Sequence, residues 1–93
     1  MTMRNETIVK RINKMFGAEN QKYPVAFLQC KEDGGRPLIT SESPAADGMK
    51  VVDYYGEFRD YYPWVDPRLE KFLDKNGLYY EWENAACVGI YNQ

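Results

Sequence analysis

The sequence contains no histidine, which excludes the usual pairs of a serine or cysteine nucleophile with a histidine base. Histidine-ligated metal sites are excluded for the same reason. The only cysteines are Cys30 and Cys87, too few for a structural zinc site. Each lies in an apolar stretch, where cysteine usually behaves as a small buried hydrophobe. We therefore expect no metal, no cofactor, no disulfide between these cysteines and a reducing, cytoplasmic environment.

Long apolar runs are also missing. No stretch approaches the roughly 20 residues that cross a bilayer, and residues 1–6 lack the apolar region of a secretory signal. Nor is there an excess of positive charge, because the formal net charge is −2. Nucleic-acid modules normally present a basic face. We therefore expect neither a membrane span nor a specific nucleic-acid ligand.

The charges are nevertheless unevenly distributed. Residues 1–16 hold four basic side chains against one acidic side chain, whereas residues 48–93 hold five against eight. The two parts of the chain should therefore favour partners of opposite charge. The basic residues near the start are most simply read as the solvated side of a helix.

The clearest pattern begins at residue 66. Asp66 and Pro67 are typical of a helix N-cap and first turn, and Asn76 followed by Gly77 is typical of a left-handed stop. The apolar residues between them share one helical face: Leu69, Phe72 and Leu73. The period then changes to two, which predicts a strand with one buried side from residue 78 and a second strand over 86–91.

An earlier helix is predicted by the apolar stripe Ile8, Val9, Ile12, Met15 and Phe16. Asn5 or Thr7 is expected to cap it, and Gly17 to end it. Strands are predicted over 25–30 and 37–40, on either side of a glycine turn. Alternation over 49–55 predicts a third strand.

This order of elements predicts a single α+β domain over residues 1–93. We expect a mostly antiparallel sheet of four or five strands with both helices on one face. If the path from the third strand through the second helix to the fourth strand is a crossover, it should be right-handed. Asp53, Glu81 and Glu83 stand beside tyrosines, which indicates that one face of the sheet is wet.

The connector over residues 56–64 is unusually aromatic. Our candidate binding residues are Phe58, Arg59, Tyr61, Tyr62 and Trp64. Tyrosine, tryptophan and arginine dominate the energetics of protein interfaces, which favours a binding surface. The same rings also suit a satellite core folded over the end of the sheet. Both alternatives are open at this point.

We interpret the chain as a non-enzymatic interaction domain, regulatory or inhibitory, that binds a protein partner or forms a homodimer. Its surface would combine the connector with the outer side of the last hairpin. The alternative is a small-molecule pocket lined by tyrosine, tryptophan and Arg59. An enzyme that uses only carboxylates ranks third, with these candidates: Asp53, Glu57, Asp60, Glu81 and Glu83. The texture of residues 53–91 resembles that of short proteins from phages and other mobile elements, which implies such an origin.

Overall fold

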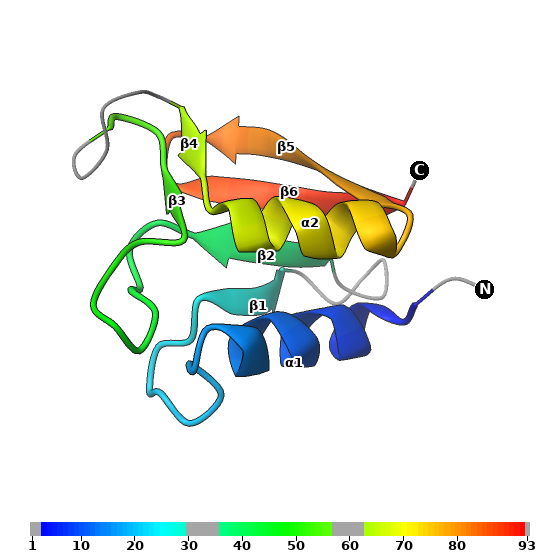
Figure 1. The fold of residues 1–93 in the computed structure, drawn as a ribbon, viewed down its shortest axis with the longest axis horizontal. Helices are drawn as coiled ribbons and strands as arrows, with labels where there is room; N and C mark the ends of the chain where they lie inside the picture. The colour runs from blue at the N-terminus through cyan, green and yellow to red at the C-terminus, as the bar shows by residue number, and fades with distance from the viewer. Residues whose placement is uncertain (1–2, 30–35, 57–62, 93) are drawn as a thin grey trace.

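The structure, a computed structural model, describes residues 3–29, 36–56 and 63–92 (Figure 1). Its elements are α1 (Asn5–Met15), β1 (Ala26–Gln29), β2 (Arg36–Thr40), β3 (Val52–Asp53), β4 (Trp64–Val65), α2 (Pro67–Lys75), β5 (Leu78–Asn84) and β6 (Cys87–Asn92). Four strands form an antiparallel sheet in the order β1-β2-β6-β5, and β3 pairs with β4 in a separate two-stranded sheet. The predicted α+β fold is confirmed.

The main sheet and the two helices form two α-β-β units, α1-β1-β2 and α2-β5-β6. Their second strands, β2 and β6, pair at the centre, so the first strands, β1 and β5, lie at the two edges. Figure 1 shows both helices on the same side of the sheet, running in opposite directions. α1 contacts β1 and β2, whereas α2 contacts β5. The helices therefore cover one face of the sheet, as predicted.

The core lies between the helices and this face. Ala26, Ile39 and Val88 face the helices from three neighbouring strands, and all three are fully buried. The helices contribute apolar residues from one side each: Ile8, Ile12, Leu69 and Leu73. These residues form a single cluster, so the apolar stripes read from the sequence do mark the inner sides of both helices.

The beginning of α1 differs from the prediction. Arg4 occupies the N-cap position and makes no side-chain capping hydrogen bond, while the predicted caps Asn5 and Thr7 lie within the helix. The end agrees with the prediction, because Gly17 has a φ of +69°. α1 is fixed to β1 by a buried polar residue. The Asn13 Nδ2 donates to the carbonyl of Ala26 at 3.0 Å, and the amide of Ala26 donates to Asn13 Oδ1 at 2.8 Å.

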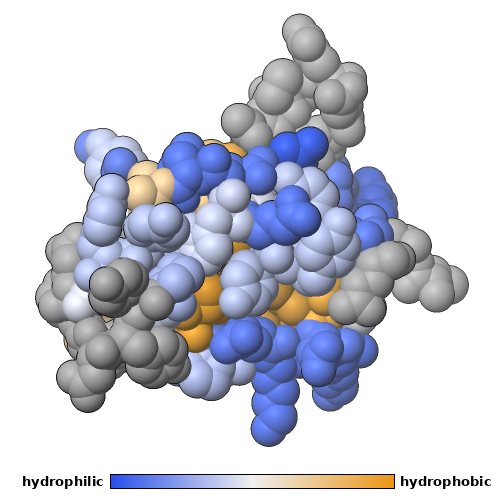
Figure 2. All heavy atoms as spheres, turned by 90° about the horizontal axis from the view of Figure 1, so that it is seen from above, coloured by the Kyte–Doolittle hydropathy of each residue, from blue (hydrophilic) through white to orange (hydrophobic). Residues whose placement is uncertain are grey.

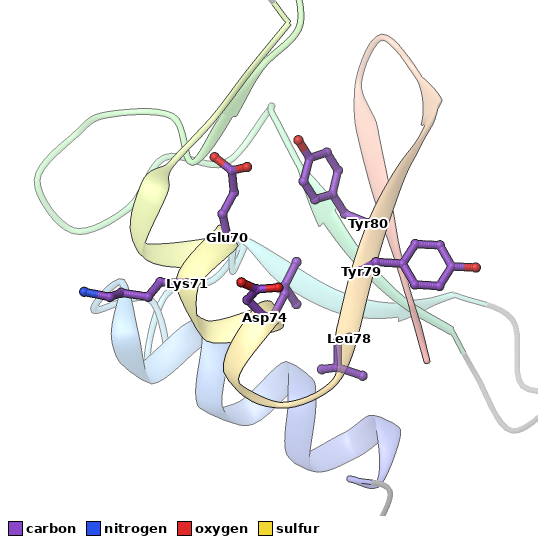
Figure 3. Close-up of a pocket in the computed structure, with 7 residues that line it drawn as sticks. Glu70, Lys71, Asp74, Leu78, Tyr79 and Tyr80 are labelled. Carbon is purple, nitrogen blue, oxygen red and sulfur yellow. The ribbon is translucent and has the colours of Figure 1, made fainter. Parts of the chain in front are cut away.

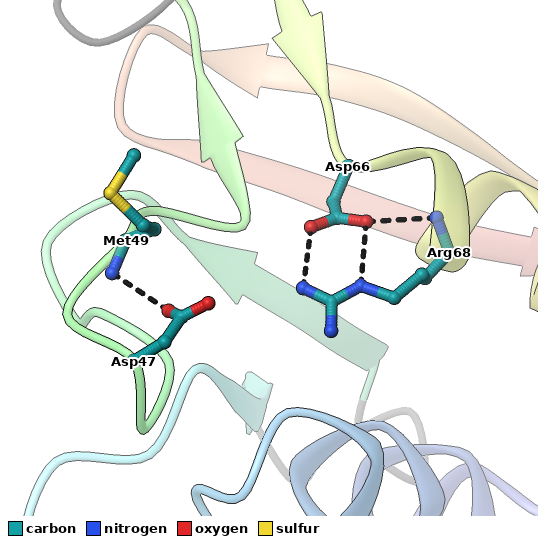
Figure 4. Close-up of polar contacts among 4 residues, drawn as sticks. All are labelled: Asp47, Met49, Asp66 and Arg68. Atoms are coloured by element: carbon teal, nitrogen blue, oxygen red, sulfur yellow. Dashed lines mark hydrogen bonds and ion pairs between the residues drawn. The ribbon is translucent and has the colours of Figure 1, made fainter.

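The beginning of α2 follows the prediction. The Asp66 Oδ1 accepts a hydrogen bond from the backbone amide of Arg68 at 2.8 Å (Figure 4). The Arg68 guanidinium also donates to both carboxylate oxygens, from Nε at 3.1 Å and from Nη2 at 2.9 Å. This hydrogen bonding raises the pKa of Arg68. The same guanidinium lies 4.8 Å from the ring centroid of Phe16, which connects the start of α2 to the end of α1.

The predicted third strand is wrong in extent and in place. Only Val52–Asp53 forms β3, and its partner is β4, so the main sheet has four strands among the described residues. Three successive residues, Val51, Val52 and Asp53, are buried, which is not the two-residue period of a half-exposed strand. Because β3 and β5 belong to different sheets, the path between them is not a crossover within one sheet, and the rule of handedness does not apply to it.

Candidate functional site

The face of the main sheet opposite the helices carries a mixed aromatic and charged surface. Phe27 and Leu38 follow or precede residues that face the helices, so their own side chains point to the opposite face. Side chains that are paired across antiparallel strands share a face, and the pairing through Gly89 places Glu81 on that same face. Leu38 is only 4% exposed, yet it does not belong to the core cluster on the helix side. We call this surface the outer face; its side chains are Phe27, Arg36, Leu38, Tyr79, Glu81, Glu83 and Tyr91.

A polar network at its centre connects three strands. The Arg36 Nη1 donates to Glu83 Oε1 at 3.0 Å, and the Tyr91 hydroxyl donates to Glu83 Oε2 at 2.9 Å. The Arg36 guanidinium also lies 4.9 Å from the centroid of the Tyr91 ring, which in turn stacks on Tyr79 at 5.5 Å. Burial and the hydrogen bond to Glu83 raise the pKa of Tyr91. Residues from β2, β5 and β6 are thereby held in one arrangement.

Gly89 makes room for this network in the middle of β6. A Cβ atom at this position would lie 3.1 Å from Glu83 Cδ and 3.2 Å from both Cε2 and the hydroxyl oxygen of Tyr91. These distances are shorter than ordinary van der Waals contact. The absence of a side chain at Gly89 therefore lets Tyr91 lie along its own strand and reach Glu83.

The outer face is acidic as well as aromatic. Glu81 is exposed and Glu83 accepts from Arg36, so one carboxylate remains in excess of the cation. The basic residues of the segment 1–16 belong to the helix layer instead: Arg4, Lys10, Arg11 and Lys14, all exposed. Glu81 and Glu83 are thus on a wet face, as expected. The same expectation was wrong for Asp53, which is 1% exposed in β3.

Most of the residues predicted to bind a partner lie outside the part of the chain that the structure describes. Phe58, Arg59, Tyr61 and Tyr62 lie outside the described residues, as do the carboxylates Glu57 and Asp60. Trp64 is described, and it is 6% exposed in β4. Its ring therefore takes the core position, one of the two alternatives for this aromatic segment, and offers little surface to a partner.

Sequence reasoning did not select Phe27, Arg36 or Gly89. For Arg36 the signal was present, because Arg36 and Leu38 alternate with Pro37 and Ile39 along one strand. A glycine inside a strand pattern is also a recognised sign of close approach. The partners of these residues could be found only after the strand order was known, since Arg36 and Glu83 are 47 positions apart.

A second feature is a pocket of about 290 Å³ between α2 and β5. Leu73 and Leu78 are its buried apolar members, and Glu70 and Asp74 bring carboxylates. In Figure 3, Glu70 projects from α2 and Tyr80 from β5, while Tyr79 points away from the helix. Burial, and then the charge of Glu70, raise the pKa of Tyr80. Figure 2 views the molecule from above and shows apolar surface framed by hydrophilic side chains.

Other kinds of site find no support in the described part of the chain. In that part, no three cysteine, aspartate or glutamate side chains are grouped as metal ligands would be. Over residues 3–29, 36–56 and 63–92, no helix is long and apolar enough to cross a membrane. Comparisons with family models, with curated proteins and with solved structures gave no match. The outer face and the pocket are therefore the basis for inferring a function.

Proposed function

We propose that this chain is a non-enzymatic protein-interaction domain, regulatory or inhibitory, that binds a protein partner through the outer face of its sheet. One observation carries the proposal. Neither α1 nor α2 covers this face, yet it holds an ordered Arg36–Glu83–Tyr91 network flanked by exposed aromatic rings. Phe27 is 37% exposed and Tyr79 is 38% exposed. Aromatic residues and arginine on a rigid surface are typical of binding hot spots.

The purely structural explanation accounts for less of this surface. Cross-strand pairs such as Tyr79 with Tyr91 stabilise a sheet by roughly 0.2–1 kcal/mol each. On the solvent-facing side of an antiparallel sheet, however, the residues are usually polar. Here Phe27 and Tyr79 present large apolar areas to solvent on that side. A partner that covers these rings removes that area from water, which favours association.

The acidic character of the outer face indicates a basic partner. Opposite charges on two surfaces accelerate encounter and disfavour wrong partners. We place the domain in the cytoplasm, because a free thiol such as that of Cys87 persists in a reducing compartment. A phage or another mobile element as its source belongs to the same proposal.

The test is affinity capture from source-cell lysate, followed by a dissociation constant for the purified partner. The variants are Phe27→Ala and Arg36→Ala, which change the outer face on β1 and β2. Their matched controls are Tyr23→Ala and Arg11→Ala, which change exposed residues elsewhere. We expect each outer-face variant to weaken binding by about 10-fold or more, and each control to bind like the parent. Equal affinities for all four variants would refute binding through the outer face.

The pocket between α2 and β5 supports a second candidate function, the binding of a small molecule. Its lining includes Tyr80 and two carboxylates, which are polar groups beside apolar leucines. Its volume of about 290 Å³ is at the lower limit of ligand pockets, which span roughly 300–1,000 Å³. It contains neither tryptophan nor arginine, the residue types expected of such a pocket from the sequence. The protein-binding proposal is therefore the stronger one.

A further inference from the structure

The two edge strands of the main sheet differ in what lies along them. At the β1 edge, the carbonyl and the amide of Ala26 are both bonded to the side chain of Asn13, at 3.0 and 2.8 Å. Ala26 and Asn13 are both buried. A further strand therefore cannot pair with β1 at Ala26, because α1 already occupies these backbone groups.

The orientation of Ala26 also shows which backbone groups of β5 point outward, because it can be followed from strand to strand through the pairing. Because Ala26 directs its amide and carbonyl away from β2, its partner Ile39 directs its own groups toward β6. Val88, which pairs with Ile39, therefore points toward β2, and its other partner Trp82 points away from β6. Tyr80, two residues earlier, has the orientation of Trp82. The amides and carbonyls of Tyr80 and Trp82 thus lie on the open edge.

Nothing described in the structure seals this edge as Asn13 seals β1. Within the described ranges, the outward backbone groups of Tyr80 and Trp82 have no hydrogen-bond partner. The pocket between α2 and β5 runs beside it, with Leu73 and Leu78 as apolar members. Glu70 and Asp74 line the same pocket (Figure 3). The edge therefore combines free hydrogen-bonding groups with a place for side chains.

We propose that the edge of β5 accepts an extended, basic segment of the protein partner, which adds to the sheet as a fifth strand. This inference rests on the proposed function and assigns the chemistry of its partner. Side chains of an added strand alternate between the two faces of the sheet. On the helix side they enter the pocket beside Glu70 and Asp74, and on the other side they lie beside Glu81.

Charge selects lysine and arginine for the added strand. Three exposed carboxylates lie along this edge, whereas Lys71 is the one cation among the residues that line the pocket. A lysine or arginine side chain that enters the pocket can bring its charged end to Glu70 or Asp74. A second copy of this chain suits the edge less well. Two paired β5 strands would bring both copies of Glu81 and Glu70 together, and like charges destabilise a sheet.

The probe for this site is a synthetic seven-residue peptide, Thr-Lys-Val-Lys-Val-Lys-Thr, with both ends blocked. Amide hydrogen exchange of the ¹⁵N-labelled chain is measured by NMR with and without about 1 mM peptide. In the free chain we expect fast exchange at Tyr80 and slow exchange at Ala26. Peptide should slow exchange at Tyr80 by about 10-fold or more and leave Ala26 unchanged. The same peptide with glutamate in place of lysine should have no effect.

Two N-methylated versions of the peptide separate strand pairing from side-chain docking. One version is methylated on the odd-numbered amides and the other on the even-numbered amides. Only one set can face β5, so one version should lose binding and the other should keep it. In the protein, the substitution Glu81→Lys should weaken binding of the unmethylated lysine peptide by about 5-fold or more. Glu6→Lys, the same charge change on exposed α1, should leave its affinity unchanged.

Three outcomes would overturn the inference: unchanged exchange at Tyr80, equal binding by both methylated peptides, or protection of Tyr80 that depends on the concentration of the chain alone. The last would assign the edge to a second copy. The outer face is tested separately by Phe27→Ala and Arg36→Ala. If these variants keep full affinity for the partner while the peptide still protects Tyr80, the outer face fails as the proposed surface and the edge stands. The converse result rejects only the edge.

Discussion

Asn13 and Leu73 occupy equivalent positions in the two α-β-β units, each four residues before a glycine of positive φ, Gly17 and Gly77. Asn13 bonds to the backbone of β1, whereas Leu73 lines the pocket beside β5. An amide at this helical position closes one edge of the sheet, and an aliphatic side chain leaves the other edge open. Two units of the same topology thus have different capacities for binding.

Replacing Asn13 with leucine should destabilise the fold. The variant leaves the buried amide and carbonyl of Ala26 without their partner, and each such group costs about 1–3 kcal/mol. We expect the free energy of unfolding in urea to fall by at least about 1 kcal/mol, and the amide of Ala26 to exchange faster. Lys14→Leu is the control, since Lys14 is exposed on the same helix. Equal stability of the two variants would contradict the role assigned to Asn13.

Leu73→Ala should also be costly. Leu73 is buried in the core cluster, and truncating a buried leucine typically lowers the free energy of unfolding by about 2–5 kcal/mol. Asp74→Ala, at the neighbouring exposed position, should change it by less than about 0.5 kcal/mol. Equilibrium denaturation measures both variants. A loss below about 0.5 kcal/mol for Leu73→Ala would mean that another side of α2 faces the sheet.

The parts of the fold that were predicted correctly depend on local signals. Asp66, Pro67 and Gly77 act on backbone groups within a few residues, so both ends of α2 could be read from the sequence. The role of Asn13 could not, because an asparagine within a helical pattern ordinarily faces solvent. Its partner, Ala26, is 13 residues away in a different element. The outer face depended in the same way on the pairing of β2 with β6, a long-range choice that periodicity does not contain.

Gly89→Ala tests the packing of the outer face. The added Cβ would meet Glu83 and Tyr91 at 3.1 and 3.2 Å, so the hydrogen bond between these side chains must lengthen or break. We expect a loss of about 1–3 kcal/mol in the free energy of unfolding, as in other overpacked sites. In a double-mutant cycle, the cost should be smaller in a Tyr91→Phe background, where the hydroxyl contact is already absent. Strict additivity would contradict this account.

Cys87 should react slowly with thiol reagents in the folded chain. It is a half-buried free thiol, and burial followed by the charges of Glu42 and Glu83 raises its pKa. Thiol reagents attack the thiolate, so the reaction rate of an unperturbed cysteine levels off above its pKa of about 8.5. The reaction rate of Cys87 should keep rising above that pH. The measurement uses a Cys30→Ser background, because Cys30 lies outside the described residues. Glu83→Gln should shift the profile to lower pH, and a profile identical to that of free cysteine would contradict burial.

Duplex DNA should not bind under physiological conditions, although α1 is basic. Lys10, Arg11 and Lys14 are exposed on one helix and can attract phosphates at low salt. Their effect is screened within a Debye length of about 8 Å at 0.15 M salt, and the net charge of the chain, −2, opposes close approach. Fluorescence anisotropy should therefore detect weak association at about 0.01 M salt and none at 0.15 M with micromolar protein. The weak binding should disappear when the three residues are changed to glutamine. Binding that survives 0.15 M salt would instead make α1 a nucleic-acid surface and would require a partner for the helix layer as well as for the sheet.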